Sequence, residues 1–198
     1  MKNLYVAGGK VPPGFFDGAV ARILELQRPD GAIPWFDAGV FDPWNHTEAA
    51  MGLATAGHLP EAERALAFLA QTQERDGSWW SQYGSAVSIE TGRYQGTGDE
   101  PKKRDTNFVA YAATGVWHHH LIADDRRLLD RYWPMVRRAM DWVLDHQTEH
   151  GEIRWAARDP ETVEDDALLT GNASIFKSLE CAVLIAEELQ AAPEAARW

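Results

Sequence analysis

Apolar residues recur at a helical spacing along nearly the whole chain, and no useful length of it alternates apolar and polar residues as a strand would. Side chains three and four positions apart share one face of a helix, so this spacing predicts amphipathic helices. One of them contains Pro134, where we expect a kink or a break because proline has no N–H to donate. The expected helices span about 15–28, 44–57, 60–73, 105–121, 124–147 and 167–190.

Two kinds of helix alternate along the chain. The helices near 44–57 and 105–121 are rich in small residues, which allow close approach and suit an inner layer, while the bulkier amphipathic helices suit an outer layer. Connections from inner to outer helix are tight, and those leading back to the next inner helix are long. All the long loops should therefore emerge at one rim, beside the N-termini of the inner helices. We expect one all-α domain of helical hairpins over residues 1–198.

A short motif of Gln, Gly four residues later and then Trp follows the end of a helix three times. The copies are Gln27-Gly31-Trp35, Gln73-Gly77-Trp79 and Gln147-Gly151-Trp155. A repeated motif at a helix end is typical of a structural element that ties neighbouring units together. We interpret it as a helix-end staple that specifies the fold, not as a catalytic group.

Composition narrows the class of protein. The formal charge is −11, which argues against nucleic acid and against an anionic membrane surface as partners. The single cysteine, Cys181, excludes a disulfide framework and fits a reducing compartment. No apolar stretch approaches the roughly 20 residues of a membrane span, and the first residues are too interrupted for a signal peptide. We expect a cytoplasmic protein.

The segment 68–79, which holds the second Gln–Gly–Trp copy, resembles the repeat motif of squalene and oxidosqualene cyclases, in which Gln caps a helix and stacks on Trp. The segments 42–51 (DPWNHTEAAM) and 115–120 (GVWHHH) resemble bacterial prenyltransferase-like proteins of the terpenoid-cyclase α/α-toroid superfamily. The likeness covers most of the chain and implies an α/α-toroid. About three of six hairpins are present, so the chain would be half of an (α/α)6 barrel, completed by a missing second half or in a homodimer.

The resemblance implies, as the leading function, a prenyltransferase or terpenoid cyclase acting on a bulky apolar isoprenoid in an aromatic-lined cavity. The Asp-x-Asp-Asp acid motif of class II cyclases has Val163 in place of its first Asp, which leaves Asp165 as the candidate proton donor. Cys181 lies among apolar residues of the last helix and suits the core better than a zinc site, and no Asp-Asp-x-x-Asp magnesium motif is evident. We expect no metal and no cofactor.

Six-hairpin glycosidases share the ring architecture, so a carbohydrate-active enzyme with a carboxylate pair is the alternative function. A non-catalytic helical-repeat binding module is the third. The candidate catalytic residues at the loop-bearing rim are Asp42, His46, Glu48, Asp105, Glu152 and Asp165. The candidate substrate-binding residues are Trp35, Trp44, Trp79, Tyr83, Asn107, Trp155 and Asn172.

Several of these residues also fit a purely structural role. Either Asp42 or Asn45 suits the N-cap of the first inner helix, and Asp105 suits that of the second. His46 and Glu48 are two positions apart and do not share a helix face, so they make a weak metal site. The run His118–His120 points in three directions at the opposite rim, and we interpret it as structural.

Overall fold

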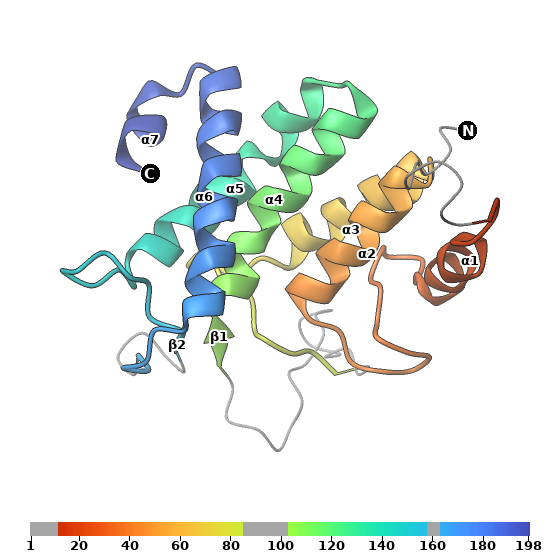
Figure 1. The fold of residues 1–198 in the computed structure, drawn as a ribbon, viewed down its shortest axis with the longest axis horizontal. Coiled ribbons are helices and arrows are strands. Elements are labelled where there is room, and N and C mark those ends of the chain that lie inside the picture. Colours follow the sequence, from red (N-terminus) through yellow and green to blue (C-terminus); the bar gives the residue numbers. More distant parts are fainter. Residues whose placement is uncertain (1–11, 85–102, 158–162) are drawn as a thin grey trace.

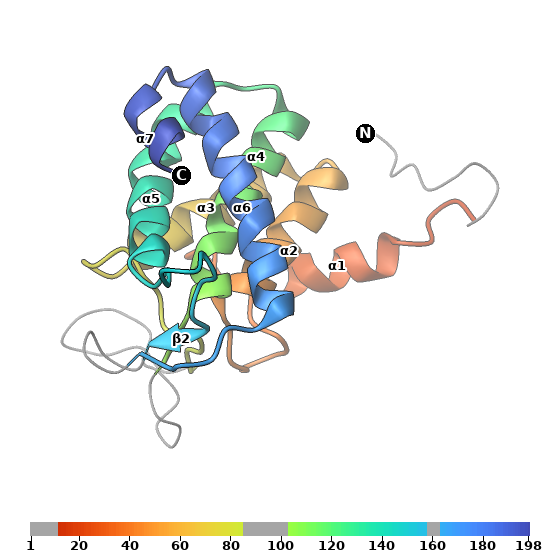
Figure 2. The same ribbon diagram turned by 60° about the vertical axis from the view of Figure 1, so that its left-hand side comes forward.

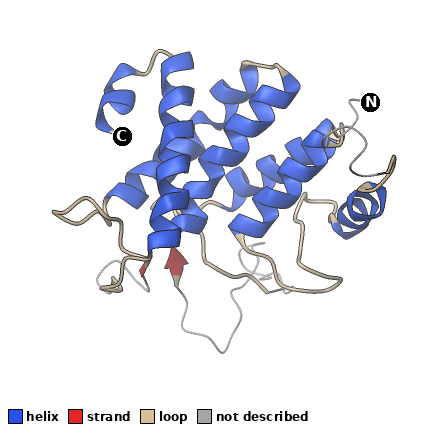
Figure 3. Ribbon diagram, in the orientation of Figure 1, coloured by secondary structure: helices blue, strands red, loops and turns tan. Residues whose placement is uncertain are grey.

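The computed structural model describes residues 12–84, 103–157 and 163–198 and is mostly helical (Figure 3). Helices and strands follow the chain order α1 (Asp17–Leu26), α2 (Pro43–Thr55), α3 (Leu59–Thr72), β1 (Arg104–Asp105), α4 (Thr106–Ala123), α5 (Arg127–Leu144), β2 (Ala156–Ala157), α6 (Leu169–Glu188) and α7 (Ala192–Arg197). The all-α prediction is confirmed. The strands are two residues long and pair antiparallel with each other.

Helices α2, α4 and α6 stand side by side, with α3 and α5 behind them (Figures 1 and 2). They begin at Pro43, Thr106 and Leu169, so successive starts are 63 residues apart. Small residues make their contact close: a Cβ added at Gly115 would lie 2.4 Å from the Cγ2 atom of Thr47. The expected inner helices are therefore α2, α4 and α6, and their spacing is more regular than that of the glutamines.

Helix α5 is one continuous helix through Pro134, so of the predicted kink or break the break is wrong. Proline leaves the carbonyl of Asp130 without its helical partner, but that residue is exposed, and water can hydrate the carbonyl. The apolar face of α5, which includes Leu129, Val136 and Met140, is fully buried in the main core and holds the helix together across the proline.

The short connections and the long loops lie at opposite ends of the helices, as predicted (Figure 1). Each short connection turns through a residue with positive φ, namely Gly57, Asp124 or Gln190. The long loops gather near the N-termini of α2, α4 and α6, and this end is called the loop rim below. Part of the second long loop, residues 85–102, lies outside the described residues.

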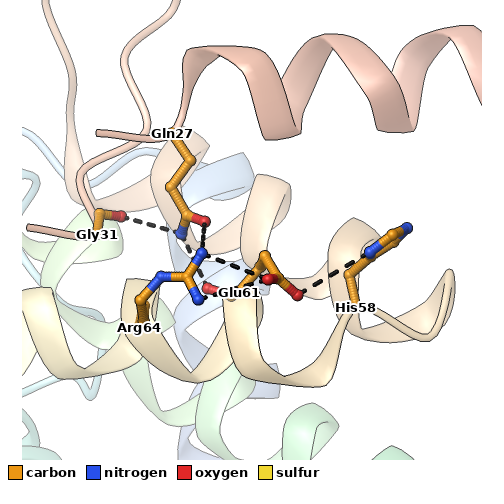
Figure 4. Close-up of polar contacts among 5 residues, drawn as sticks. All are labelled: Gln27, Gly31, His58, Glu61 and Arg64. Atoms are coloured by element: carbon orange, nitrogen blue, oxygen red, sulfur yellow. Dashed lines mark hydrogen bonds and ion pairs between the residues drawn. The ribbon is translucent and has the colours of Figure 1, made fainter. Parts of the chain in front are cut away.

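The first Gln–Gly–Trp copy is a staple between successive outer helices (Figure 4). The Gln27 side-chain amide, just after α1, donates to the carbonyl of Glu61 on α3 at 2.8 Å, and the Arg64 guanidinium donates to Gln27 Oε1 at 3.2 Å. A Cβ at Gly31 would lie 2.3 Å from the Arg64 carbonyl oxygen. Only glycine allows this approach, and its φ of +99° also favours glycine.

The second copy repeats these contacts one hairpin later. Gln73 Nε2 donates to the Gly77 carbonyl at 2.8 Å and to the Met135 carbonyl on α5 at 3.0 Å, while Arg138 donates to Gln73 Oε1. Trp79 is buried and donates from Nε1 to the Leu69 carbonyl at 3.1 Å. The interpretation of the motif as a structural staple is confirmed.

The C-terminal part contains two features absent from the sequence prediction. Helix α7 follows α6, with Pro193 in its first turn, whereas the last predicted helix ended near residue 190. Helix α6 itself is, by length and composition alone, long and apolar enough to cross a membrane, with a mean hydropathy of 1.2. In the fold it packs along α4, and residues such as Ile175, Ala182 and Ile185 are buried in the main core.

Candidate functional site

Two aspartates at the loop rim share one local design. Asp42 is the N-cap of α2 and accepts from the Asn45 backbone N–H at 2.8 Å. Asp105 is the N-cap of α4 and accepts from two backbone N–H groups of its first turn. In each case the second carboxylate oxygen accepts an indole N–H at 2.6 Å, from Trp35 at Asp42 and from Trp155 at Asp105. The predicted caps are thus present, and a tryptophan from a long loop fixes each carboxylate.

Both carboxylates are removed from water, Asp42 completely and Asp105 with 7% exposure. Burial raises the pKa of Asp105, and the hydrogen bonds from Trp155 and from the backbone oppose this rise without cancelling it. Lys103 stands over the Trp155 ring at 4.0 Å and adds a weaker opposing charge. A carboxyl group whose pKa lies above its ordinary range can carry a proton to a substrate.

An aromatic cluster lies one turn inside the loop rim, between α2 and α4. The Trp44 ring lies 5.3 Å from the Tyr111 ring and 6.5 Å from the Phe108 ring, with 24° between the Trp44 and Phe108 planes. The Tyr111 hydroxyl donates to Glu48, and burial together with this contact raises the pKa of Tyr111. The cluster therefore joins flat apolar faces to a carboxylate, as sugar binding requires.

Two buried polar atoms, one in the first turn of α2 and one in the first turn of α4, have no partner among the described residues. They are Trp44 Nε1, a donor, and Asn107 Oδ1, an acceptor. Unpaired buried polar atoms are uncommon, and a hydroxyl-bearing ligand would satisfy both kinds.

His46 has a structural position. It is fully buried, its Nδ1 accepts from the Ile33 backbone N–H at 3.1 Å, and its Nε2 faces the Ala65 carbonyl at 2.9 Å. Because one nitrogen accepts and the other donates, the ring is neutral with its proton on Nε2. Both nitrogens are occupied by backbone groups, so His46 does not enter the proposed catalytic set.

We expect His46 to make the protein less stable as the pH falls below about 6.5. Burial lowers its pKa in the folded state, so the stability it contributes is present above the unfolded-state pKa and is lost as the pH falls. The pKa values of His118 and His119 are lowered by burial too, and add to the same trend. Urea unfolding at pH 7.5 and 5.5 measures the loss, and NMR should show the His46 ring uncharged at pH 6.

His46→Gln is the control for this prediction, because removal of the buried ring should reduce the pH dependence of unfolding. A His46 ring signal that titrates near pH 6.5 in the folded protein would contradict the buried neutral tautomer.

Two of the predicted wall residues belong to the core. Trp79 is 1% exposed, and Tyr83 stacks on Phe41 with 4.8 Å between ring centroids while its hydroxyl accepts the Trp80 backbone N–H. Neither ring can line a substrate cavity, so this part of the prediction is wrong. The sequence shows that they lie on the long loop but not that the loop folds inward there.

The remaining candidates lie on the third long loop. Asn172, in the first turn of α6, clamps the backbone of Ile153 through both its N–H and its carbonyl, which is a structural role. Glu152 lies beside Thr148, and its carboxylate pKa is lowered by hydrogen bonds to its own backbone and to that hydroxyl. The Asp165 side chain is almost fully exposed and pairs with Arg154 at 2.9 Å. No described contact joins Glu152 or Asp165 to the two capping aspartates.

Phe108 and Tyr111 are the functional candidates that the sequence prediction missed. They follow the Asp105 cap by three and six residues, so helical spacing places them near the face of α4 that carries Asn107. A sequence signal that could have found them is the repeat of 63 residues between Asp42 and Asp105. Aligning these two aspartates places Glu48 and Tyr111 at equivalent positions.

Comparison with known proteins gives one sequence relative and several solved structures, and no family model matches. The chain is 46% identical over 165 residues to MMP endo-(1,4)-3-O-methyl-alpha-D-mannosidase of Mycolicibacterium hassiacum. The match covers 83% of this chain and 43% of the relative, so the chain spans less than half the length of the curated protein it matches.

The solved structures share the fold. An unsaturated glucuronyl hydrolase specific for heparin superposes with a TM-score of 0.62 at 14% identity, over 90% of this chain and 52% of the other. The GH76 α-mannanase of Bacteroides thetaiotaomicron gives a TM-score of 0.54 at 16% identity, over 79% and 45%. At these identities the likeness concerns architecture alone, and it confirms the α/α-toroid fold class.

These relatives contradict the leading interpretation of the sequence. A prenyltransferase or terpenoid cyclase with a bulky apolar isoprenoid substrate does not fit a chain whose close sequence relative bears the name of a mannosidase. The two solved structures also bear the names of carbohydrate enzymes. The prediction rested on the Gln–Gly–Trp staple, which holds outer helices together, and on segments 42–51 and 115–120. These segments indicate the shared toroid architecture, which does not determine the chemistry.

Proposed function

We propose that this chain is the substrate-binding and catalytic part, or a portion of that part, of a glycoside hydrolase that cleaves internal α-mannosidic bonds. The observation that carries the proposal is the 46% identity to an endo-mannosidase over most of this chain. Because the chain spans 43% of that relative, further residues outside this sequence can contribute to the complete site. The carboxylates and aromatic rings of the loop rim support the same reaction class.

The cluster of Trp44, Phe108 and Tyr111 is the proposed sugar-binding wall. Pyranose rings present flat C–H faces that pack on aromatic rings, and their hydroxyls need both donors and acceptors. Trp44 Nε1 is a donor and Asn107 Oδ1 is an acceptor, and neither has a hydrogen-bond partner among the described residues. Glu48, held by the Tyr111 hydroxyl, adds a further acceptor for sugar hydroxyls.

Asp105 is the proposed general acid, and a second carboxyl group completes the pair that glycoside hydrolysis needs. The raised pKa of Asp105 favours the protonated form, which gives its proton to the glycosidic oxygen as the bond to the anomeric carbon breaks. The second carboxylate assists attack at that carbon, and water supplies the new hydroxyl group. Trp155 holds the Asp105 carboxyl group in place. Asp42 is fully buried with both carboxylate oxygens occupied, so it keeps the structural role of an N-cap.

The direct test is incubation of the purified chain with a 1,4-linked 3-O-methyl-α-mannose oligosaccharide. We expect products of intermediate length with new reducing ends, because an endo-acting enzyme cuts within the polymer. Mass spectrometry of the products distinguishes this pattern from the release of single residues. A matched β-linked oligosaccharide should remain intact. Release of monosaccharide alone, or cleavage of both anomers, would contradict the proposal.

Trp44→Ala should weaken oligosaccharide binding by roughly tenfold, because it removes a stacking face and a buried N–H donor. Isothermal titration calorimetry measures the change. The matched control is Trp133→Ala on α5, whose ring packs on Trp198 away from the loop rim. Equal losses in the two variants would show that the effect comes from general destabilisation and not from sugar contact.

A further inference from the structure

The third Gln–Gly–Trp copy has the same local structure as the first two. Gln147 Nε2 donates to the Gly151 carbonyl at 2.9 Å, as Gln73 Nε2 donates to Gly77 at 2.8 Å. The glycine φ angles agree closely, at +98° for Gly77 and +99° for Gly151. The loop of residues 147–151 is therefore folded as a staple, and it is called the Gln147 socket below.

The two filled copies define what a staple receives. Each glutamine amide donates to a backbone carbonyl of the next outer helix, and an arginine three residues after that carbonyl donates back to the glutamine oxygen. The two accepting helices also place these residues at the same distance from their own C-terminal glutamine. Glu61 and Arg64 lie 12 and 9 residues before Gln73, and Met135 and Arg138 lie 12 and 9 residues before Gln147. The occupant thus has a fixed chemical signature.

The Gln147 socket receives no such helix among the described residues. Gln147 is exposed, whereas Gln73 is buried. A Cβ at Gly151 would meet nothing within 4 Å, whereas one at Gly77 would lie 2.3 Å from the Arg138 carbonyl oxygen. The described contacts of α7 with α5 lie before the socket: Arg197 pairs with Asp141, and Trp198 packs on Trp133.

The inner helix on the same edge is also uncovered. Ala110 and Ala113 of α4 are completely buried. The residues 63 positions later on α6, Ala173 and Phe176, are exposed, Phe176 by 65%. Leu169, at the start of α6, is 85% exposed. The face of α4 that carries Ala110 and Ala113 is therefore buried, whereas the equivalent face of α6 is exposed. This exposed face lies on the last helix of the row α2–α4–α6.

We propose that this edge binds one further helical hairpin, whose outer helix enters the Gln147 socket and whose inner helix packs on the exposed face of α6. The outer helix carries an arginine three residues after the carbonyl that accepts from Gln147. Its inner helix covers Ala173 and Phe176, whose counterparts on α4, Ala110 and Ala113, are buried in this fold. This docking does not depend on the proposed mannosidase activity.

A second copy of this chain does not carry the required signature. Its unstapled outer helix is α1, and the position nine residues before Gln27 is Gly18, not arginine. The occupant is therefore a hairpin of different sequence, and the length by which the sequence relative exceeds this chain leaves room for one.

The test uses the full chain and a synthetic peptide of residues 127–144, the sequence of α5, as the probe. This peptide carries Met135 and Arg138, which fill the Gln73 staple. At millimolar concentration we expect saturable NMR shifts of the Gln147 side-chain amide and of Gly151. The Gly77 signal should not move, because its site is already occupied. A peptide with Arg138→Ala should bind at least fivefold more weakly.

Gln147→Ala and Gly151→Ala supply the protein-side controls. Both residues lie at the surface, so both variants should fold, and both should abolish the peptide-induced shifts. Gly151→Ala acts by placing a methyl group where the carbonyl of the occupant must lie. Absence of shifts at the socket, or equal affinity of the two peptides, would overturn the proposal. A dimer in sedimentation that Gln147→Ala dissociates would also overturn it, by giving the socket to a second copy.

Discussion

Asp105→Asn is expected to lower the rate of mannoside hydrolysis by about 10²- to 10⁴-fold, the usual contribution of a positioned general acid. Asparagine keeps the size of the side chain and is as good an N-cap as aspartate, so α4 should still begin at Thr106. What the variant loses is the transferable proton. Rates on the oligosaccharide and thermal unfolding of the same preparation separate the two roles.

The matched control is Asp124→Asn at the other end of α4. Asp124 has a φ of +54°, which asparagine adopts readily, and it lies far along the helix from the loop rim. Its rate should equal that of the parent chain. If Asp105→Asn kept full activity and lost only stability, Asp105 would be a structural cap and the acid would have to be sought elsewhere.

The pH dependence gives an independent readout of the same group. Burial raises the pKa of Asp105, so its contribution to stability is full below the ordinary carboxyl pKa of about 4 and is lost as the pH rises through the raised value. Activity that needs the protonated form falls over the same interval. In Asp105→Asn both dependences should flatten, which a defect in packing alone would not cause.

Much of the fold can be predicted from the sequence because its determinants are local. Helical spacing, the N-cap aspartates and the Gln–Gly motif each act within a few residues, and the structure places all three as expected. The continuous helix through Pro134 depends instead on tertiary burial of its apolar face, which no local pattern reports. Local propensity is a weak prior wherever packing decides.

The site was harder to predict because it depends on the direction in which side chains point. Trp44 and Trp79 look alike in the sequence, yet one lies in the aromatic cluster at the rim and the other in the core. His46 follows a rim aspartate by four residues but turns inward to two backbone groups. The function was misread for a related reason: the most distinctive motif of the chain determines architecture, and the same architecture hosts different chemistries.

Gly77→Ala should destabilise the chain by about 3–5 kcal/mol, and Gly151→Ala by only about 1 kcal/mol. Both glycines have a φ near +99°, so both variants incur the same backbone strain. Only the Cβ at position 77 also meets the Arg138 carbonyl oxygen, at 2.3 Å, and it must push α5 away from the Gln73 staple. For a chain of this length the melting temperatures should fall by roughly 6–20 °C and 2–4 °C respectively.

Urea unfolding of the two variants beside the parent chain measures the difference directly. Because the strain is common to both, the difference reports how tightly an occupied staple is packed against its outer helix. If the two variants lost the same free energy of unfolding, the Gln73 staple would be packed no more tightly than the empty Gln147 socket. The core alone would then hold the outer helices in place. If instead the peptide of residues 127–144 stabilises the parent chain but not Gly151→Ala, the cost of Gly151→Ala in its presence rises toward that of Gly77→Ala. The three loops are then the same structural element in filled and unfilled states.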